Sequence, residues 1–178
     1  MVCHYSDKQI LLVGEGDFSF SLSLAKAFGS STNITAASFD IRGNGLGRNY
    51  NNGKANVEEL ERLGCTVVRG VNIHSMTSDC RLARYDIIIF HFIRAGKHHE
   101  VVKSFMESAR EMVKDENGEI HVTHKTIYPF NEQDIKALAE ETGLRLIKQM
   151  KFHNWIFPGN SVDTYSIGSS AVTFMFKK

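Results

Sequence analysis

Residues 11–21 read LLVGEGDFSFS, and this stretch decides the fold of the chain. It overlaps a short apolar run, residues 9–13, which is typical of a buried strand that meets a turn at glycine. Phe20 and Leu24 then recur on one face of a helix expected over residues 18–28. The stretch therefore predicts the strand, loop and helix that begin an α/β domain.

The rest of the chain continues this alternation. Strands are expected over 34–39, 66–71, 86–92, 119–123, 144–152 and 171–176, helices over 56–63, 98–113 and 131–142, and a Gly/Asn-rich loop over 41–53. Asn131 is expected to cap the last helix. This order predicts a single Rossmann-like α/β domain over residues 1–178, with a mostly parallel sheet and helices on both faces. The most apolar strand should lie mid-sheet, and the last two strands should form an antiparallel pair at one edge.

The composition indicates a soluble, intracellular globular protein. The longest apolar runs are much shorter than a membrane span, and the N-terminus has no apolar signal segment. The three cysteines, Cys3, Cys65 and Cys80, lie far apart, as expected for reduced thiols, and their spacing predicts no metal site. The net charge of +1 argues against tight non-specific binding of nucleic acid, although a local basic patch is enough to bind RNA.

Two glycines, Gly14 and Gly16, follow the first strand and let the backbone turn sharply and approach a ligand. A dinucleotide fingerprint needs a third glycine where Ser19 stands, which argues against a nicotinamide-dependent oxidoreductase, and no phosphate P-loop is present. A plain strand-to-helix turn is the alternative. Glu15 and Asp17 flank the helix start, so we expect them to orient a ligand or cap the helix rather than to act in catalysis.

Polar residues after the next two strands favour an adenosine-type ligand. Asp40 ends the second strand, where a carboxylate accepts hydrogen bonds from both ribose hydroxyls. Asn72 follows the third strand, and its amide both donates and accepts, as an adenine edge requires. A turn or cap role for Asp40 and an ordinary loop position for Asn72 are the alternatives.

Five segments, in order, resemble the eukaryotic rRNA uridine-N3 methyltransferase family (the large-subunit, 25S-type enzymes). They are residues 11–21, 86–92, 118–126, 129–130 and 157–159, and the resemblance spans about residues 8–177. It implies a class I S-adenosylmethionine-dependent methyltransferase fold, with a seven-stranded sheet whose last strand is antiparallel. It also implies methyl transfer to a uridine ring nitrogen in RNA, with rRNA as the partner. The nucleolus or nucleus would be the setting, and the cytoplasm is the alternative.

The resemblance implies that S-adenosylmethionine is the cofactor and lies at the ends of the first three strands. The loop that would hold it, its methionine part above all, consists of Gly14, Glu15, Gly16, Asp17, Phe18 and Ser19. Asp40 would hold the ribose, and Asn72 stands where the family has an acid near adenine.

The acceptor side departs from the family. Residues 90–96 read FHFIRAG where the family usually has FNFPH followed by a glycine, so His91 replaces asparagine and Arg94 replaces histidine. His91 is the first catalytic candidate, as a base, because it ends a central strand and titrates near neutrality; a buried histidine is the alternative. Arg94 is the second, as a group that binds a phosphate or a different acceptor. The changes leave open a catalytically altered homologue that acts as a cofactor- or RNA-binding module.

Three further residues are candidates for contacts to the acceptor. His124 and Lys125 end the fifth strand and would line the same cleft, and Trp155 would stack on a flipped base. An exposed turn and packing over the sheet edge are the alternatives. His98 and His99 are not expected to share a metal ion, since adjacent helical residues point about 100° apart.

Overall fold

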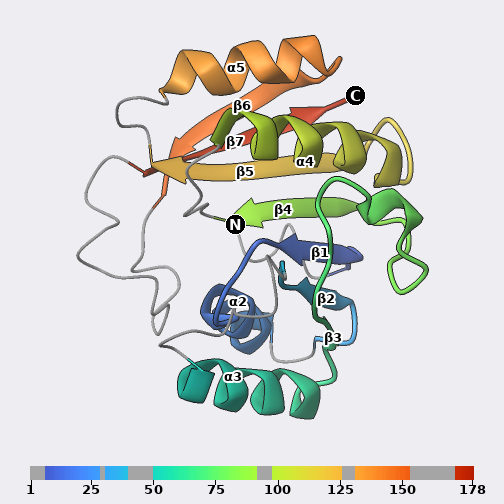
Figure 1. Ribbon diagram of the computed structural model, residues 1–178, viewed down its shortest axis with the longest axis vertical. Helices are drawn as coiled ribbons and strands as arrows, with labels where there is room; N and C mark the ends of the chain where they lie inside the picture. The colour runs from blue at the N-terminus through green and yellow to red at the C-terminus, as the bar shows by residue number, and fades with distance from the viewer. Residues whose placement is uncertain (1–6, 29–30, 40–49, 92–97, 126–130, 153–170) are drawn as a thin grey trace.

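A computed structural model shows one seven-stranded sheet with helices on both faces (Figure 1). The structure describes residues 7–28, 31–39, 50–91, 98–125, 131–152 and 171–178. The strands are β1 (Ile10–Val13), β2 (Ile34–Ala37), β3 (Thr66–Val68), β4 (Ile87–His91), β5 (Glu119–Lys125), β6 (Arg145–Lys151) and β7 (Ala171–Lys177). The helices are α2 (Ser19–Phe28), α3 (Tyr50–Arg62), α4 (His98–Met112) and α5 (Glu132–Glu141), with a short 3₁₀ turn, η1 (Met76–Ser78).

The strand order is β3-β2-β1-β4-β5-β7-β6. Strands β1 to β5 are parallel to one another, whereas β7 is antiparallel to both β5 and β6. The predicted fold class is therefore confirmed, including the antiparallel pair at one edge. Because parallel strands share a direction, the segments that follow β1, β2, β3 and β4 all leave the sheet at the carboxyl ends of the strands. Ligands bind there in such folds, and we call this border of the sheet the ligand-binding edge.

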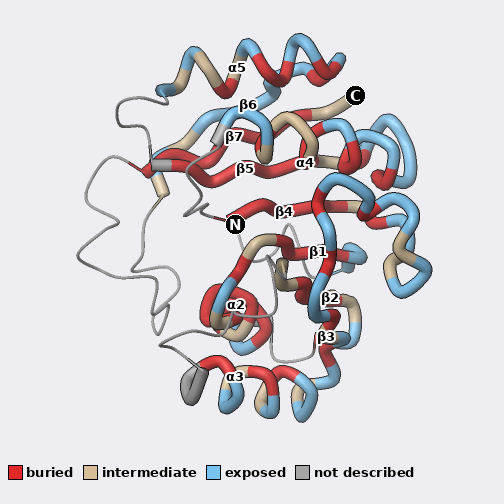
Figure 2. Tube along the Cα trace, viewed as in Figure 1, coloured by how far each residue is buried: buried red, intermediate tan, exposed pale blue. Residues whose placement is uncertain are grey.

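Side chains along each strand alternate between two cores. Leu11 and Val13 pack with η1, α4 and α5 on one side, which we call the α4 face. Ile10 and Leu12 pack with α2 and α3 on the other side, the α2 face. Figure 2 shows the central strands buried between the helix layers, as two-sided burial of a parallel sheet requires.

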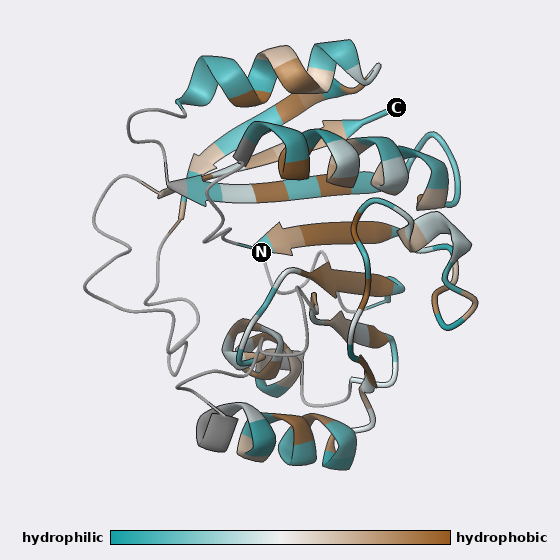
Figure 3. Cartoon of the chain, in the orientation of Figure 1, coloured by the Kyte–Doolittle hydropathy of each residue, from teal (hydrophilic) through white to brown (hydrophobic). Residues whose placement is uncertain are grey.

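β4 lies mid-sheet, as its composition predicts. It pairs with β1 and with β5, and all five of its residues are buried. Figure 3 shows it among the most hydrophobic segments, whereas the outward sides of α3 and α5 are polar. Burial on both faces explains why this strand reads as a continuous apolar run rather than an alternating one.

The predicted cap of α5 is also confirmed. The Asn131 side chain accepts hydrogen bonds from the backbone of Gln133 and Asp134, and the Asp134 carboxylate accepts one from the Asn131 backbone. This reciprocal capping box satisfies amide groups that the first helical turn leaves without partners.

The predicted boundary that differs most from the structure is the start of α3. Helix α3 begins at Tyr50, inside the segment 41–53 that we expected to be a loop. Asparagine and glycine are poor helix formers, but packing outweighs that preference here. Gly53 is buried, and Leu60 is fully buried against the α2 face of the sheet. Residues 40–49 lie outside the described part of the chain.

Two findings concern membranes and metal ions. No helix among the described residues is long and apolar enough to cross a membrane. The same residues contain no group of three or more histidine, cysteine or acidic side chains placed to hold a metal ion.

Candidate functional site

The glycine loop, residues 14–18, connects β1 to α2 at the ligand-binding edge of the sheet. Gly14 has φ +96°, and a Cβ there would lie 2.5 Å from the Phe90 ring. Phe18 has φ +58°, a conformation that among the described non-glycine residues only it adopts. Gly16 is exposed, and a Cβ there would meet no atom of the described residues within 4 Å. The loop is thus fixed on its inner side and open on its outer side.

Glu15 points inward, toward the start of α2. Its carboxylate accepts hydrogen bonds from the backbone N–H of Phe20 (2.8 Å), the backbone N–H of Ser21 (3.0 Å) and the Ser21 hydroxyl. A negative charge at a helix N-terminus is favoured by the helix dipole and by its free amide groups. Burial nevertheless raises the pKa of Glu15 to about 7, and the Asp17 charge adds to this effect, while the hydrogen bonds oppose it. Glu15 therefore shapes the loop from inside.

Asp17 joins the loop to two helices. Its Oδ1 accepts a hydrogen bond from the backbone N–H of Ser19 (3.1 Å), at the start of α2. Its carbonyl oxygen accepts one from the Asn56 side chain of α3 (2.8 Å). These contacts hold the backbone of the loop in place without closing its outer side at Gly16.

The end of β4 supports the loop on the α4 face through aromatic rings. Phe90 stacks on Phe105 of α4 with ring centroids 4.6 Å apart, and it meets Phe39, which follows β2, edge-on at 5.8 Å. Such arrangements are the preferred geometries of aromatic pairs. Phe90 therefore occupies the space directly beneath Gly14.

His91, the next residue, points to the α2 face. Its ring stacks on Phe20 of α2 with centroids 3.7 Å apart and planes 8° from parallel, and Phe152 lies 5.0 Å away. Burial lowers the pKa of His91 to about 3, so the ring is neutral at physiological pH. An efficient general base has a pKa near the working pH. His91 is thus buried, as the alternative interpretation of the sequence expected, and its role as a catalytic base stays a prediction.

The segment after β3 places Asn72 at the same edge of the sheet. Asn72 is exposed, and its Oδ1 accepts a hydrogen bond from the His74 backbone N–H (3.0 Å). The His74 ring contacts the Ser104 hydroxyl of α4 (2.8 Å), and the Ser108 hydroxyl donates to the Ile73 carbonyl (3.3 Å). Asn72 therefore sits in a turn that is held on α4.

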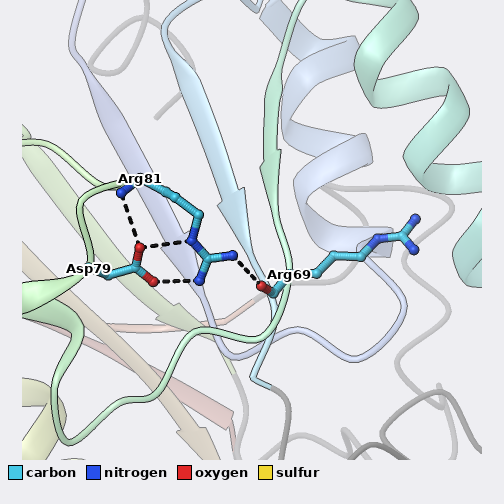
Figure 4. Close-up of polar contacts among 3 residues, drawn as sticks. All are labelled: Arg69, Asp79 and Arg81. Atoms are coloured by element: carbon cyan, nitrogen blue, oxygen red, sulfur yellow. Dashed lines mark hydrogen bonds and ion pairs between the residues drawn. The ribbon is translucent and has the colours of Figure 1, made fainter.

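A group of hydrogen bonds from Arg81, which we call the Arg81 brace, also holds this segment in place (Figure 4). The Arg81 guanidinium donates to both carboxylate oxygens of Asp79 (2.8 and 2.6 Å) and to the Arg69 carbonyl (2.8 Å). The Arg69 side chain itself extends away from this group (Figure 4). The hydrogen bonds from Arg81 hold the pKa of Asp79 below its usual range. A planar guanidinium suits this two-pronged contact.

The acceptor candidates are only partly described. His124 is buried on the α4 face of β5, near the end of the strand, and its contact with an acceptor stays a prediction. Lys125 ends β5 at the ligand-binding edge, but its side chain lies outside the described residues, as do Asp40, Arg94 and Trp155. The structure thus brings together the glycine loop and His91, and it places Asn72 at the same edge.

Sequence reasoning missed the aromatic supports on both sides of the loop. Phe39, Phe90 and Phe105 form one, and Phe20 with Phe152 forms the other around His91. The signal that could have found them is strand alternation, since Phe90 and His91 must point to opposite faces at the strand's end.

Comparisons with known proteins show which family the chain belongs to. Residues 11–164 match the model of the BMT5-like family, described as rRNA (uridine-N3-)-methyltransferase BTM5-like. The chain belongs to this family. "Uncharacterized protein At4g26485" of Arabidopsis thaliana is 42% identical, over 97% of this chain and 94% of that protein. "Heavy metal-associated isoprenylated plant protein 41" of the same plant is 40% identical over 89% of this chain, which spans only 33% of that longer protein.

A solved structure identifies the fold of this BMT5-like chain. Magnesium protoporphyrin IX methyltransferase from Synechocystis PCC 6803, solved with bound S-adenosylmethionine, superposes with a TM-score of 0.63 at 12% identity, covering 99% of this chain and 74% of that one. The BMT5-like chain thus has the Rossmann-like fold of S-adenosylmethionine-dependent methyltransferases. The open outer side of its loop at Gly16 fits a ligand that approaches the backbone closely.

Proposed function

We propose that this protein binds S-adenosylmethionine at the glycine loop and transfers its methyl group to a uridine ring nitrogen in RNA, with rRNA as the acceptor. One observation carries the proposal. In a chain of the BMT5-like family, the loop after β1 is fixed from beneath by Phe90 and from within by Glu15, yet it stays open at Gly16. A preorganised backbone with one open side is what close binding of a cofactor requires.

The cofactor would be held by residues from three strand ends. The backbone of the glycine loop and of Ser19, with the Asp17 side chain, would hold the methionine part. Asp40 would hold the ribose, and the exposed amide of Asn72 would meet the adenine edge. Glu15 would act as a positioning residue, because its carboxylate is committed to α2. Bound there, S-adenosylmethionine supplies an electrophilic methyl carbon.

The acceptor side must orient the uridine ring and remove its ring proton. The neutral, stacked ring of His91 supports the rim of the site rather than this proton transfer. We therefore assign orientation of the acceptor to Arg94, Lys125 and Trp155. A nucleolar or nuclear location follows from rRNA as the acceptor.

A second function is favoured by a specific feature of β4. His91 stands where the family has asparagine, and its stacking on Phe20 fills the α2 side of the strand end with rings. A site altered in this way could keep the cofactor without transferring its methyl group. The protein would then be a cofactor- or RNA-binding module.

Two measurements test these functions in order. Calorimetry with S-adenosylmethionine and S-adenosylhomocysteine should detect binding. If no heat is released at millimolar ligand, the protein is neither the methyltransferase nor the cofactor-binding module proposed above. Incubation of total rRNA with labelled S-adenosylmethionine, followed by mass spectrometry of nucleosides, should then yield N3-methyluridine. Binding without any methylated nucleoside would support the non-catalytic module instead.

A further inference from the structure

Charge is distributed unevenly along the chain. Residues 144–178 contain five basic residues and one acidic residue, whereas residues 1–143 contain 16 basic and 19 acidic residues. The net charge of +1 is therefore the balance of +4 in the last 35 residues and −3 in the rest. The basic residues of this last part are Arg145, Lys148, Lys151, Lys177 and Lys178.

All but the last of these basic residues lie on the β6–β7 pair, at one edge of the sheet. β6 is the edge strand, and six of its seven residues are exposed. Figure 2 shows the strand as a largely exposed band, in contrast to the buried strands beside it. An edge strand rich in lysine resists pairing with another copy, because like charges would face each other. The cations are thus displayed to solvent rather than used in packing.

An irregularity in strand pairing gathers three of these cations on one face. Arg145 pairs with Lys177 and Lys148 pairs with Met175, because the register shifts between Leu146 and Lys148. Residues three apart in a regular strand point to opposite faces, but the shift turns Arg145 and Lys148 to the same face. That face is the α2 face, since Phe174 and Phe176 of β7 belong to the core on the α4 face. Lys177 points the same way by strand alternation.

The charges of this group are available for a partner. Among the described residues, none of Arg145, Lys148 and Lys177 forms an ion pair. The nearest acid on this face of β5 is Glu119, whose carboxylate lies 2.8 Å from the His121 ring. The basic residues therefore keep their positive potential toward solvent.

The strand that carries Arg145 and Lys148 runs toward the candidate site. β6 is antiparallel to β7, as β5 is, so β5 and β6 run in the same direction. The carboxyl end of β6, at Lys151, thus lies at the ligand-binding edge. From Arg145 to Lys148 the strand covers about 10 Å, at roughly 3.3 Å a residue, whereas Lys151 points to the α4 face, because it pairs with Val172. This length reaches neighbouring phosphates of an extended polynucleotide.

We propose that Arg145, Lys148 and Lys177 form a phosphate-binding strip that holds the backbone of the acceptor RNA. The inference rests on the proposed function, which supplies an RNA acceptor, and it assigns the backbone contact to particular residues. Phosphate contacts position a nucleic acid without reading its sequence, which suits a surface outside the site of methyl transfer.

The test compares two triple variants that lose the same charge. One is Arg145→Gln, Lys148→Gln and Lys177→Gln. The control is Lys26→Gln, Lys54→Gln and Arg62→Gln, which neutralises exposed residues of α2 and α3 at the other end of the sheet. Binding of a fluorescent oligouridine is measured from low to high salt, and S-adenosylmethionine binding is measured in parallel.

The strip variant should bind oligouridine about 100-fold more weakly at 0.1 M salt. The slope of the logarithm of its binding constant against the logarithm of the salt concentration should be less steep by about 2, because each of the three lost phosphate contacts contributes roughly 0.7. The control should behave as the unaltered protein. An equal loss of oligouridine affinity in both variants would overturn the strip and leave the proposed function standing. The same holds if the strip variant loses no affinity, which is the result expected if the true partner of the strip is an acidic protein. Absence of RNA binding by the unaltered protein would overturn both.

Discussion

The ring of Phe90 occupies the space that a side chain at Gly14 would need. A Cβ at position 14 would lie 2.5 Å from one ring carbon and 2.8 Å from the next, and the backbone there has φ +96°. Phe90 itself has little freedom, because it is buried and stacked on Phe105. The strand end and the glycine loop therefore fix each other, and this pair of residues sets the height of the loop above the sheet.

The first prediction separates the two glycines of the loop. Gly14→Ala should destabilise the fold by about 1–3 kcal/mol from the backbone conformation alone, with a further cost from the displaced Phe90 ring. Gly16→Ala should leave the melting temperature unchanged, because its Cβ would enter open space, but it should weaken S-adenosylmethionine binding. Thermal melts and calorimetry measure the two effects. Equal affinity for the cofactor in Gly16→Ala and the unaltered protein would place the cofactor elsewhere.

Much of the fold was predictable because its signals are local. Short apolar runs located the strands, and the missing helix between the last two strands predicted their antiparallel pairing. The start of α3 was not predictable, because Gly53 and its neighbours form a helix only where tertiary packing supports it.

The site was less predictable, because its key facts depend on side-chain direction. The sequence left the roles of Glu15 and His91 open. Only the fold shows that Glu15 turns inward to α2 and that His91 lies against Phe20. The facing of Arg145 and Lys148 likewise depends on a register shift that strand periodicity alone does not contain.

The second prediction concerns the buried carboxyl group of Glu15. Its pKa of about 7 in the folded protein exceeds the value of 4.5 for the free side chain, so the folded state binds the proton more tightly. Stability from this group is present below pH 4.5 and is lost as the pH rises to about 7, by about 3 kcal/mol at most. In Glu15→Gln this loss should disappear. Denaturant unfolding across this range, with exposed Glu58→Gln as the control, measures it; an unchanged pH profile in Glu15→Gln would contradict the burial.

The third prediction tests the structural role of His91. The folded pKa of about 3 lies below the value of 6.5 for free histidine, so protonation favours the unfolded state, and stability falls as the pH drops below about 6.5. His91→Phe keeps a ring against Phe20 and should therefore lose less stability in acid than the unaltered protein. It should also keep methyl transfer with an unchanged pH–rate profile. Loss of kcat with intact cofactor binding would instead return His91 to a catalytic role.

The last prediction concerns the brace formed by Arg81. Its two hydrogen bonds to Asp79 and one to the Arg69 carbonyl hold the segment that carries Asn72. Arg81→Lys keeps the charge but cannot reproduce the planar, two-pronged contact. Because this group is half exposed, the melting temperature should hardly change, whereas the KM for S-adenosylmethionine should rise with kcat unchanged, since the adenine edge is held less firmly. Arg84→Lys, an exposed neighbour, is the matched control. Equal KM values in the two variants would mean that the brace does not influence the adenine side of the site.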